Sequence, residues 1–245
     1  GGKDFENNQF NRATQALRSP GSTFKLLIYA SALSNGIKPE SQFIDLPKCW
    51  KDYCPKNFNN QYLGKISLSK AFTSSSNIVA VELLDKLGFG NVISTANSLG
   101  VGKSQKLEKY LPLAVGAHGE TLMNMTAAYA AIANRGVYKI PSPIEKIIGP
   151  KNMVIWSHPQ DQTRGKQVVT KKVADTLNLM LEQAVSQGTG NTASLSTRPV
   201  AGKTGTSDGN RDLWFIGSLP QLTTGVWFGN DNNNETIMNS GNAAW

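Results

Sequence analysis

The sequence of 245 residues predicts an α+β fold, in which an antiparallel β-sheet is flanked by helices and accompanied by a helical subdomain. Two observations lead to this prediction. The first half of the chain has apolar residues at helical spacings, and its segments end at glycine or Asn-Gly. The last part has three strand-like runs separated by short turns, and a strongly amphipathic helical segment precedes them.

The first predicted helix covers residues 23–33. A Pro and a Ser just before it are typical start residues, and the Asn-Gly pair at 35–36 is a typical stop signal. The stretch that follows, as far as Tyr62, is rich in Pro, Asn and aromatic side chains, so we expect a loop.

Several further helices are predicted before the middle of the chain. Residues 66–88 contain two helical pieces separated by a run of serines, whose hydroxyl groups compete with a helix for backbone hydrogen bonds. Residues 91–100 and 121–136 continue the helical spacing, and each of them closes with a glycine.

The second half of the chain combines strands with one helix. Residues 142–149 and 152–158 are strand-like and surround a Gly-Pro-Lys turn. Residues 170–190 contain an amphipathic helix with the apolar face Val173, Leu177, Met180, Leu181, Ala184 and Val185. The runs 199–207, 212–219 and 223–231 predict an antiparallel meander, and the polar tract 230–242 predicts a loop.

The bulk composition limits the class of protein. A hydrophobic content of 39% and a charged content of 17% are typical of a globular domain. No apolar run approaches the roughly 18–20 residues that span a bilayer. The net charge of +8 comes from scattered Lys and Arg without a base-stacking motif, so we expect no nucleic acid partner. The chain starts without Met, and we interpret it as part of a longer protein.

Cysteine and histidine are scarce. Cys49 and Cys54 lie in "CWKDYC", and the sequence leaves two alternatives open: a disulfide that closes a small loop, or two free thiols. His118 and His158 are the only histidines, and neither lies in a metal-binding or Ser-His-Asp pattern. We therefore expect no metal and no cofactor.

A serine and a lysine three residues apart open the first predicted helix. Because such residues share one helix face, the Lys25 amine can hydrogen-bond the Ser22 hydroxyl. A lysine whose pKa is lowered by burial or by a second cation can act as a base, so the pair fits a nucleophile and its base. Taken alone, it fits a capping serine and a solvated lysine as well.

Two later segments carry polar side chains that fit a substrate site. Ser75 and Asn77 lie at the break between two predicted helices, either in an ordinary turn or as a hydroxyl and an amide that face a ligand. The segment "AGKTGTSDG" contains Lys203, Thr204, Gly205 and Thr206. A glycine in a strand permits the close approach of a ligand, so this segment fits either a carboxylate site or an edge strand.

Taken together, the order and the separations of these segments match the Ser-x-x-Lys, Ser-x-Asn and Lys-Thr-Gly motif set of serine penicillin-recognising enzymes. The stretches "QFNRATQALRSPGSTFK", "CPKNFNNQYLGKISLSKAFTSSSNIVAV", "TAAYAAIANRG", "QGTG" and "GKTGTSDGNRDLWFIGSLP" are similar to the transpeptidase domain of class A (bifunctional) penicillin-binding proteins. The resemblance extends over nearly the whole of residues 1–245. It implies a β-lactamase/transpeptidase-like fold, with the family's opening strand and C-terminal helix outside this chain. A glycosyltransferase domain and a membrane anchor are expected upstream in the parent protein.

The resemblance also implies a reaction. The expected activity is that of a peptidoglycan D,D-transpeptidase, which cross-links stem peptides through a serine acyl-enzyme and is inhibited by β-lactams. The implied catalytic residues are Ser22, Lys25, Ser75, Asn77 and Lys203, and the implied substrate-binding residues are Thr204, Gly205 and Thr206. In this scheme Ser22 attacks, Lys25 accepts its proton and Ser75 relays a proton to the leaving amine.

Partners and location follow from the same resemblance. The expected partners are peptidoglycan stem peptides, β-lactam antibiotics and cell-wall synthesis proteins, with membrane contact only through the upstream anchor. The expected location is the periplasm, at the extracytoplasmic face of the bacterial cytoplasmic membrane.

Two alternative functions share the three motifs. A β-lactamase needs a general base for hydrolysis, and Glu120 with Asn124 in "ETLMN" has the spacing of such a base in one class. We interpret Glu120 instead as a helix-start acid, which the helix dipole favours. The second alternative is a non-catalytic β-lactam sensor, against which the flanking stretches of the bifunctional type argue.

Overall fold

The structure, a computed structural model, describes residues 4–159 and 165–238. Its α-helices are α1 (Lys25–Ser34), α2 (Leu68–Thr73), α3 (Asn77–Leu87), α4 (Phe89–Ser98), α5 (Leu122–Ala133) and α7 (Lys171–Ser186). Its strands are β1 (Gln42–Asp45), β2 (Gly64–Ser67), β3 (Val137–Tyr138), β4 (Lys146–Ile148), β5 (Val154–Ser157), β6 (Lys166–Gln167), β7 (Ala201–Thr206), β8 (Asp212–Leu219) and β9 (Leu222–Gly229). The short 3-10 helices include η1 (Gly21–Phe24), η5 (Asn191–Ala193) and η6 (Asp208–Asn210).

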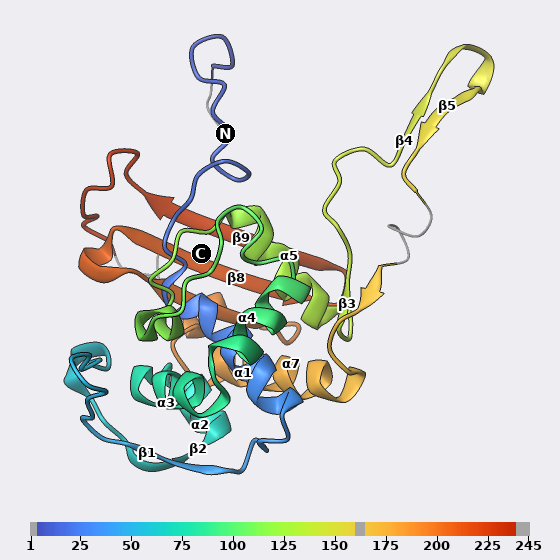
Figure 1. The fold of residues 1–245 in the computed structure, drawn as a ribbon. Coiled ribbons are helices and arrows are strands. Elements are labelled where there is room, and N and C mark those ends of the chain that lie inside the picture. The colour runs from blue at the N-terminus through green and yellow to red at the C-terminus, as the bar shows by residue number, and fades with distance from the viewer. Residues whose placement is uncertain (1–3, 160–164, 239–245) are drawn as a thin grey trace.

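The last three strands form an antiparallel sheet in the order β7-β8-β9. The pairing places Phe215 of the central strand between Thr204 and Val226. Helices α5 and α7 pack against this sheet, and Figure 1 shows the other helices stacked beyond them. The predicted α+β class with a late antiparallel meander is therefore confirmed.

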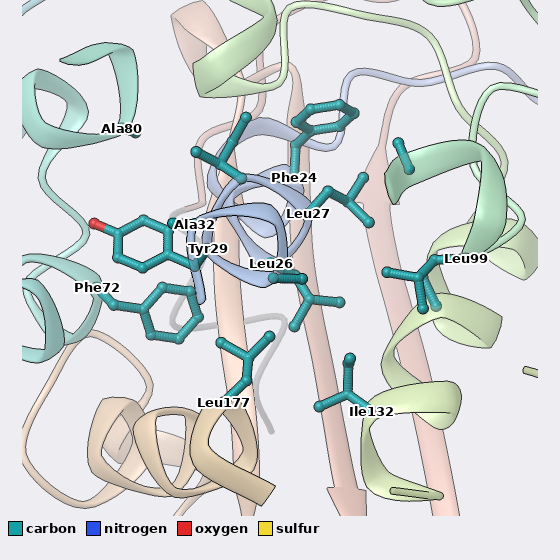
Figure 2. Packing of buried hydrophobic residues seen from close by; sticks show 14 of the residues in the cluster. Phe24, Leu26, Leu27, Tyr29, Ala32, Phe72, Ala80, Leu99, Ile132 and Leu177 are labelled. Atoms are coloured by element: carbon teal, nitrogen blue, oxygen red, sulfur yellow. The ribbon is translucent and has the colours of Figure 1, made fainter. Parts of the chain in front are cut away.

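Helix α1 lies at the centre of the protein because its sequence is apolar on all sides. Every residue from Lys25 to Ala32 is buried. Figure 2 shows the side chains of other elements around this helix, among them Phe72, Ala80, Leu99, Ile132 and Leu177. Burial of one large aliphatic side chain contributes about 1.5–3 kcal/mol. The N-terminal end of α1 is therefore anchored in the main hydrophobic core.

Hydroxyl caps explain where several predicted helices begin. Ser67 accepts a hydrogen bond from a backbone N–H of α2, and Ser76 does the same for α3. Thr121 and Thr170 cap α5 and α7 in the same way. The buried face of α7 consists of Ala174, Leu177, Met180, Leu181, Ala184 and Val185, which agrees with the predicted apolar face except at its first residue.

The stretch between α1 and residue 62, expected to be a loop, contains strand β1. This strand pairs with β2, which occupies the place where the helical piece 66–88 was expected to begin. A strand of four residues shows only a brief alternation, and its pairing partner lies beyond a long loop, so the local sequence gives no clear signal. The helix itself starts only after its cap at Ser67.

The remaining predictions concern the loops and hairpins. Cys49 and Cys54 form a disulfide, which decides between the two alternatives. The predicted strands at 142–149 and 152–158 form the hairpin β4-β5, which extends away from the rest of the protein in Figure 1. The predicted loop at 230–242 has no helix or strand as far as residue 238, and its last residues lie outside the described part. Within the described residues, no helix combines the length and the apolar character needed to cross a membrane.

Candidate active site

Three distant segments of the chain meet at the N-terminal end of α1. Ser22 lies in η1 immediately before this helix, Ser75 lies at the break between α2 and α3, and Lys203 lies in β7. Hydrogen bonds from the amines of Lys25 and Lys203 connect the three segments. The structure therefore brings the three sequence motifs into one site.

Two glycines allow η1 and β7 to touch. A Cβ added to Gly205 would lie 2.3 Å from the carbonyl oxygen of Pro20, and one added to Gly21 would lie 2.4 Å from that of Thr206. Gly21 also has a φ of +52°, which L side chains rarely adopt. Any larger side chain at either position would push the segment that contains Ser22 away from the strand that carries Lys203.

The amine of Lys25 is the centre of the site. Its Nζ lies 3.0 Å from Ser22 Oγ, 2.6 Å from the Ser75 carbonyl oxygen and 3.2 Å from Ser75 Oγ, and it also contacts Asn77 Oδ1. An ammonium group has three hydrogens and no lone pair, whereas a neutral amine has a lone pair that can accept the Ser22 proton. The geometry thus suits a base that serves two hydroxyl groups.

Ser75 has an unusual backbone and lies between two amines. Its φ is +60°, a left-handed conformation that few non-glycine residues adopt and that persists only where the surroundings enforce it. Its Oγ accepts a hydrogen bond from Lys203 Nζ at 2.9 Å and faces Lys25 Nζ on the other side. A hydroxyl in this position can pass a proton between an amine and a bound substrate.

Burial changes the pKa of both lysines. Lys25 and Lys203 are 0% exposed, whereas Ser22 and Ser75 are partly exposed. Burial lowers the pKa of Lys25 well below its usual value near 10.5, the charge of Lys203 lowers it further, and the charge of Asp45 opposes both effects. Burial also lowers the pKa of Lys203 to about 7. The condition for a lysine base, a depressed pKa beside a second amine, is met at Lys25.

The two threonines of the third motif have different surroundings. Thr206 is partly exposed and adjoins Gly21. Thr204 is buried, and its Oγ1 donates a hydrogen bond to Thr189 Oγ1 at 2.9 Å. Thr189 also lies 3.4 Å from Lys203 Nζ. Sequence reasoning did not assign Thr189, although it lies in the "QGTG" stretch that supports the family resemblance.

Two further polar residues, Asp45 and Asn57, hydrogen-bond to the segment 75–77 of the second motif. Sequence reasoning missed both. Asp45 accepts a hydrogen bond from Ser76, and Asn57 accepts one from the backbone N–H of Asn77. Both lie in the stretch that was expected to be a loop, where single polar residues carry no signal. Only the folded chain shows that they reach the active site.

Glu120 and Asn124 are hydrogen-bonded to each other, and within the described part of the chain neither forms a hydrogen bond with a residue of the site. The Glu120 carboxylate is buried and accepts hydrogen bonds from Gly102 N, Thr121 N and Asn124 Nδ2. Glu120 lies one residue before the Thr121 cap and two before Leu122, the first residue of α5, so the interpretation as an acid in the helix start is wrong. His118 is buried nearby, and no group of three His, Cys, Asp or Glu side chains in the described residues could hold a metal ion.

Comparison with known proteins assigns the chain to a family. The family described as the penicillin binding protein transpeptidase domain matches residues 1–244. The chain belongs to this transpeptidase family. Among the relatives, penicillin-binding protein 1A of Aquifex aeolicus is 38% identical over 238 residues, and penicillin-binding protein 4 of Bacillus subtilis is 35% identical over 235 residues. The alignments cover 94% of this chain but only 32% and 37% of these relatives, so the chain spans about a third of their length.

Solved structures of this family have the same fold. Penicillin-binding protein 1A from Haemophilus influenzae superposes with a TM-score of 0.84 at 26% identity, covering 94% of this chain and 40% of that one. The PonA1 protein of Mycobacterium tuberculosis in complex with penicillin V gives a TM-score of 0.83 at 27% identity, covering 97% of this chain and 67% of that one. The transpeptidase fold therefore accounts for the convergence of the three motifs.

Proposed function

We propose that this domain is a serine D,D-transpeptidase that cross-links peptidoglycan stem peptides and is acylated by β-lactams. One observation carries the proposal: the buried amine of Lys25, with its lowered pKa, contacts the hydroxyl groups of both Ser22 and Ser75. Membership of the transpeptidase family and the likeness to a protein solved with penicillin V support it.

The first step is acylation of Ser22. Its Oγ attacks the carbonyl carbon between the two terminal D-alanine residues, while Lys25 Nζ takes the hydroxyl proton. The backbone N–H groups of Ser22 and Thr206 donate hydrogen bonds to the developing oxyanion, and one such donor is worth about 2.7–4 kcal/mol in comparable enzymes. Close packing at Gly21 and Gly205 holds the two donor segments together.

Collapse of the tetrahedral intermediate breaks the bond to the terminal D-alanine. Ser75 donates its proton to the leaving nitrogen and regains one from Lys25, which returns to its neutral form. Lys203 in its protonated form and the Thr206 hydroxyl bind the carboxylate of the leaving residue. Thr204 joins them by turning its hydroxyl from Thr189 to the substrate.

The acyl-enzyme then reacts with an amine. The amino group of a neighbouring stem peptide attacks the ester carbon and gives a proton to Lys25. As the bond between the carbonyl carbon and Ser22 Oγ breaks, Lys25 returns that proton to Ser22 Oγ, so the hydroxyl and the neutral amine are both restored. The side-chain amide of Asn77 holds the donor peptide during both steps. A β-lactam acylates Ser22 by the same first step, but its leaving nitrogen stays tethered to the acyl group and blocks the acceptor amine.

The parent protein and its location belong to the same proposal. The curated relatives are about three times as long as this chain, so we place the domain in a longer polypeptide with a glycosyltransferase domain and a membrane anchor upstream. Its substrate, peptidoglycan, places the domain outside the cytoplasmic membrane, where cell-wall synthesis proteins are its partners. The disulfide between Cys49 and Cys54 is compatible with such an oxidising compartment.

The proposal is tested with an acyl-D-alanyl-D-alanine peptide as donor and a stem-peptide amine as acceptor. We expect release of one D-alanine for each ligated peptide, and neither product with Ser22→Ala. Lys86, an exposed lysine on α3, provides the matched control, and Lys86→Ala should leave both products unchanged. Release of D-alanine without ligation would indicate a hydrolase, and a folded protein that releases none would contradict the proposal.

A further inference from the structure

Asp45 is a buried carboxylate that accepts hydrogen bonds from Ser76 in the second motif and from the loop 57–63. It is 1% exposed at the end of β1. Its Oδ1 accepts hydrogen bonds from Ser76 Oγ at 2.6 Å and Asn57 Nδ2 at 2.7 Å, and its Oδ2 accepts one from Leu63 N at 2.9 Å. In residues 4–159 and 165–238, no Lys or Arg forms an ion pair with it. A buried charge held only by neutral donors is costly, so its retention calls for a reason.

The first connection runs from Asp45 through Ser76. The Ser76 hydroxyl donates a hydrogen bond to Asp45. The same hydroxyl accepts a hydrogen bond from Val79 N and thereby caps the N-terminus of α3. Asp45 therefore fixes both the rotamer of the capping serine and the place where α3 begins. That place lies between the two reacting members of the second motif, Ser75 and Asn77.

The second connection runs through Asn57. Its Nδ2 donates to Asp45, which leaves its Oδ1 to accept the backbone N–H of Asn77 at 2.8 Å. The adjacent Lys56 carbonyl oxygen accepts a hydrogen bond from Asn77 Nδ2 at 2.6 Å. This pair of contacts orients the Asn77 amide, so that its Oδ1 faces Lys25 Nζ.

The segment held in this way contains the unfavourable backbone of the site. Ser75, with its φ of +60°, is tied on one side to the end of α2 through the bond from its N–H to the Phe72 carbonyl oxygen. On the other side it is tied through Ser76 to Asp45. A left-handed serine persists only where its surroundings enforce it. Here the backbone bond from Ser76 N to the Ala71 carbonyl oxygen and the bond from Lys25 Nζ to the Ser75 carbonyl oxygen act together with Asp45.

We propose that Asp45 is a positioning residue, which holds Ser75 and Asn77 in their reacting geometry through Ser76 and Asn57. The proposal rests on the function proposed above, because it assigns Asp45 to that same site. Among the described residues, Asp45 forms no hydrogen bond with Ser22 or Lys25, and it positions the second motif through the two bridging side chains. Its charge acts on Lys25 in addition.

The charge of Asp45 gives this role a measurable signature. The charged groups that act on Lys25 are Lys203 from β7 and Asp45 from β1, and Asp45 raises the pKa of Lys25. Asp45 also acts on α1, where burial of Tyr29 raises the pKa of that phenol and the charge of Asp45 raises it further. Asp45→Asn removes the charge with little change of shape, so the pKa of Lys25 should fall further. Ser76→Ala, which breaks the bridge but keeps the charge of Asp45, should leave that pKa unchanged.

The test compares three variants by their second-order rate constants for acylation with penicillin, measured between pH 5 and pH 9. Asp45→Asn should acylate about 10–100-fold more slowly at its plateau, because a misplacement near 1 Å costs about 10²-fold. The acidic limb of its pH–rate profile, where the rate rises with pH, should also move to lower pH. Ser76→Ala should slow acylation without moving the limb. Ser74→Ala is the matched control and should acylate like the parent protein. Among the described residues, the Ser74 hydroxyl bonds only to carbonyl groups of α2.

The outcomes separate this proposal from the proposed function. A parent protein that forms no adduct on Ser22 contradicts the function, whatever Asp45 does. A parent that does form it, together with an Asp45→Asn variant of equal rate and equal pH profile, contradicts the positioning role. Should Asp45→Asn fail to fold, Ser76→Ala decides: restoration of the rate by Ser76→Thr, which keeps the hydroxyl, supports the role, and a parental rate in Ser76→Ala overturns it.

Discussion

Lys25 Nζ lies 3.0 Å from Ser22 Oγ, and a single turn of helix joins the two residues. The lysine is completely buried while the serine is partly exposed, so the amine is shielded from water and the hydroxyl is open to a ligand. Because α1 is packed on all sides, neither residue can move without disturbing the core.

Replacement of Lys25 should abolish most of the acylation. Arginine keeps a positive charge but cannot lose its proton, and alanine lacks a base, so both Lys25→Arg and Lys25→Ala should acylate about 10²–10⁴-fold more slowly. Stopped-flow measurement with a chromogenic β-lactam checks this prediction, with Lys86→Ala as the control. A parental rate in either folded variant would show that Lys25 is a bystander.

The acylation rate should depend on pH in a bell shape. It should rise as pH increases through the lowered pKa of Lys25, since only the neutral amine accepts the serine proton. Above pH 7 it should fall again, because Lys203 then loses the charge that binds the substrate carboxylate. A substrate ester without that carboxylate should lose the alkaline limb and keep the acidic one. A flat profile between pH 5 and pH 9 would contradict both assignments.

The free energy of unfolding should increase with pH through the contribution of Lys203. Its pKa is about 7 in the folded protein and near 10.5 when unfolded, so between these values the unfolded state binds more protons. The burial cost is complete below pH 7 and is relieved as pH rises toward 10.5. The Tm of the parent protein, measured relative to Lys203→Met at each pH, should therefore rise across this window. A constant difference would show that the buried amine does not titrate there.

The contact between η1 and β7 should tolerate no side chain at position 205. The Cβ of Gly205→Ala would meet the Pro20 carbonyl oxygen, so we expect a loss of about 1–3 kcal/mol in stability and at least tenfold slower acylation. Gly90→Ala is the control, because Gly90 lies in α4 with open space around it, and alanine there should stabilise by about 0.5–1 kcal/mol. Equal behaviour of the two variants in thermal unfolding would remove the packing argument.

Glu120 should matter for stability and not for turnover. The Glu120 carboxylate accepts hydrogen bonds from three N–H groups. In Glu120→Gln an amide N–H would face some of these donors, and the protein should lose about 1–3 kcal/mol of stability. The lifetime of the penicillin adduct should remain many minutes in parent and variant alike. Rapid hydrolysis in the parent that disappears in Glu120→Gln would favour the β-lactamase alternative instead.

The sequence indicated the parts of the site that depend on local spacing or on motif order. Ser22 and Lys25 share a helix face, so their contact could be predicted from three residues of separation. The meeting of Ser75 and Lys203 rested on the family resemblance, since no local rule brings residues so far apart together. The catalytic roles of these residues stay predictions until they are measured.

The unpredicted parts depend on tertiary contacts. Strand β1 places Asp45 behind Ser76, but four residues of strand within a Pro- and Asn-rich stretch carry too little pattern to be recognised. Thr189 follows α7 and meets Thr204 only because the helix packs on β7. Each of these residues acts through a hydrogen bond to another residue of the site, and such a role leaves no signature in residue type or spacing.

The acyl-enzyme itself is the most direct test of the account. The protein is incubated with penicillin, its intact mass is followed with time, and the tryptic peptides of the adduct are sequenced by mass spectrometry. We predict one adduct per chain, located on Ser22, stable for many minutes and absent from Ser22→Ala. An adduct on Ser75, or an undiminished adduct in Ser22→Ala, would contradict the assignment of nucleophile and base.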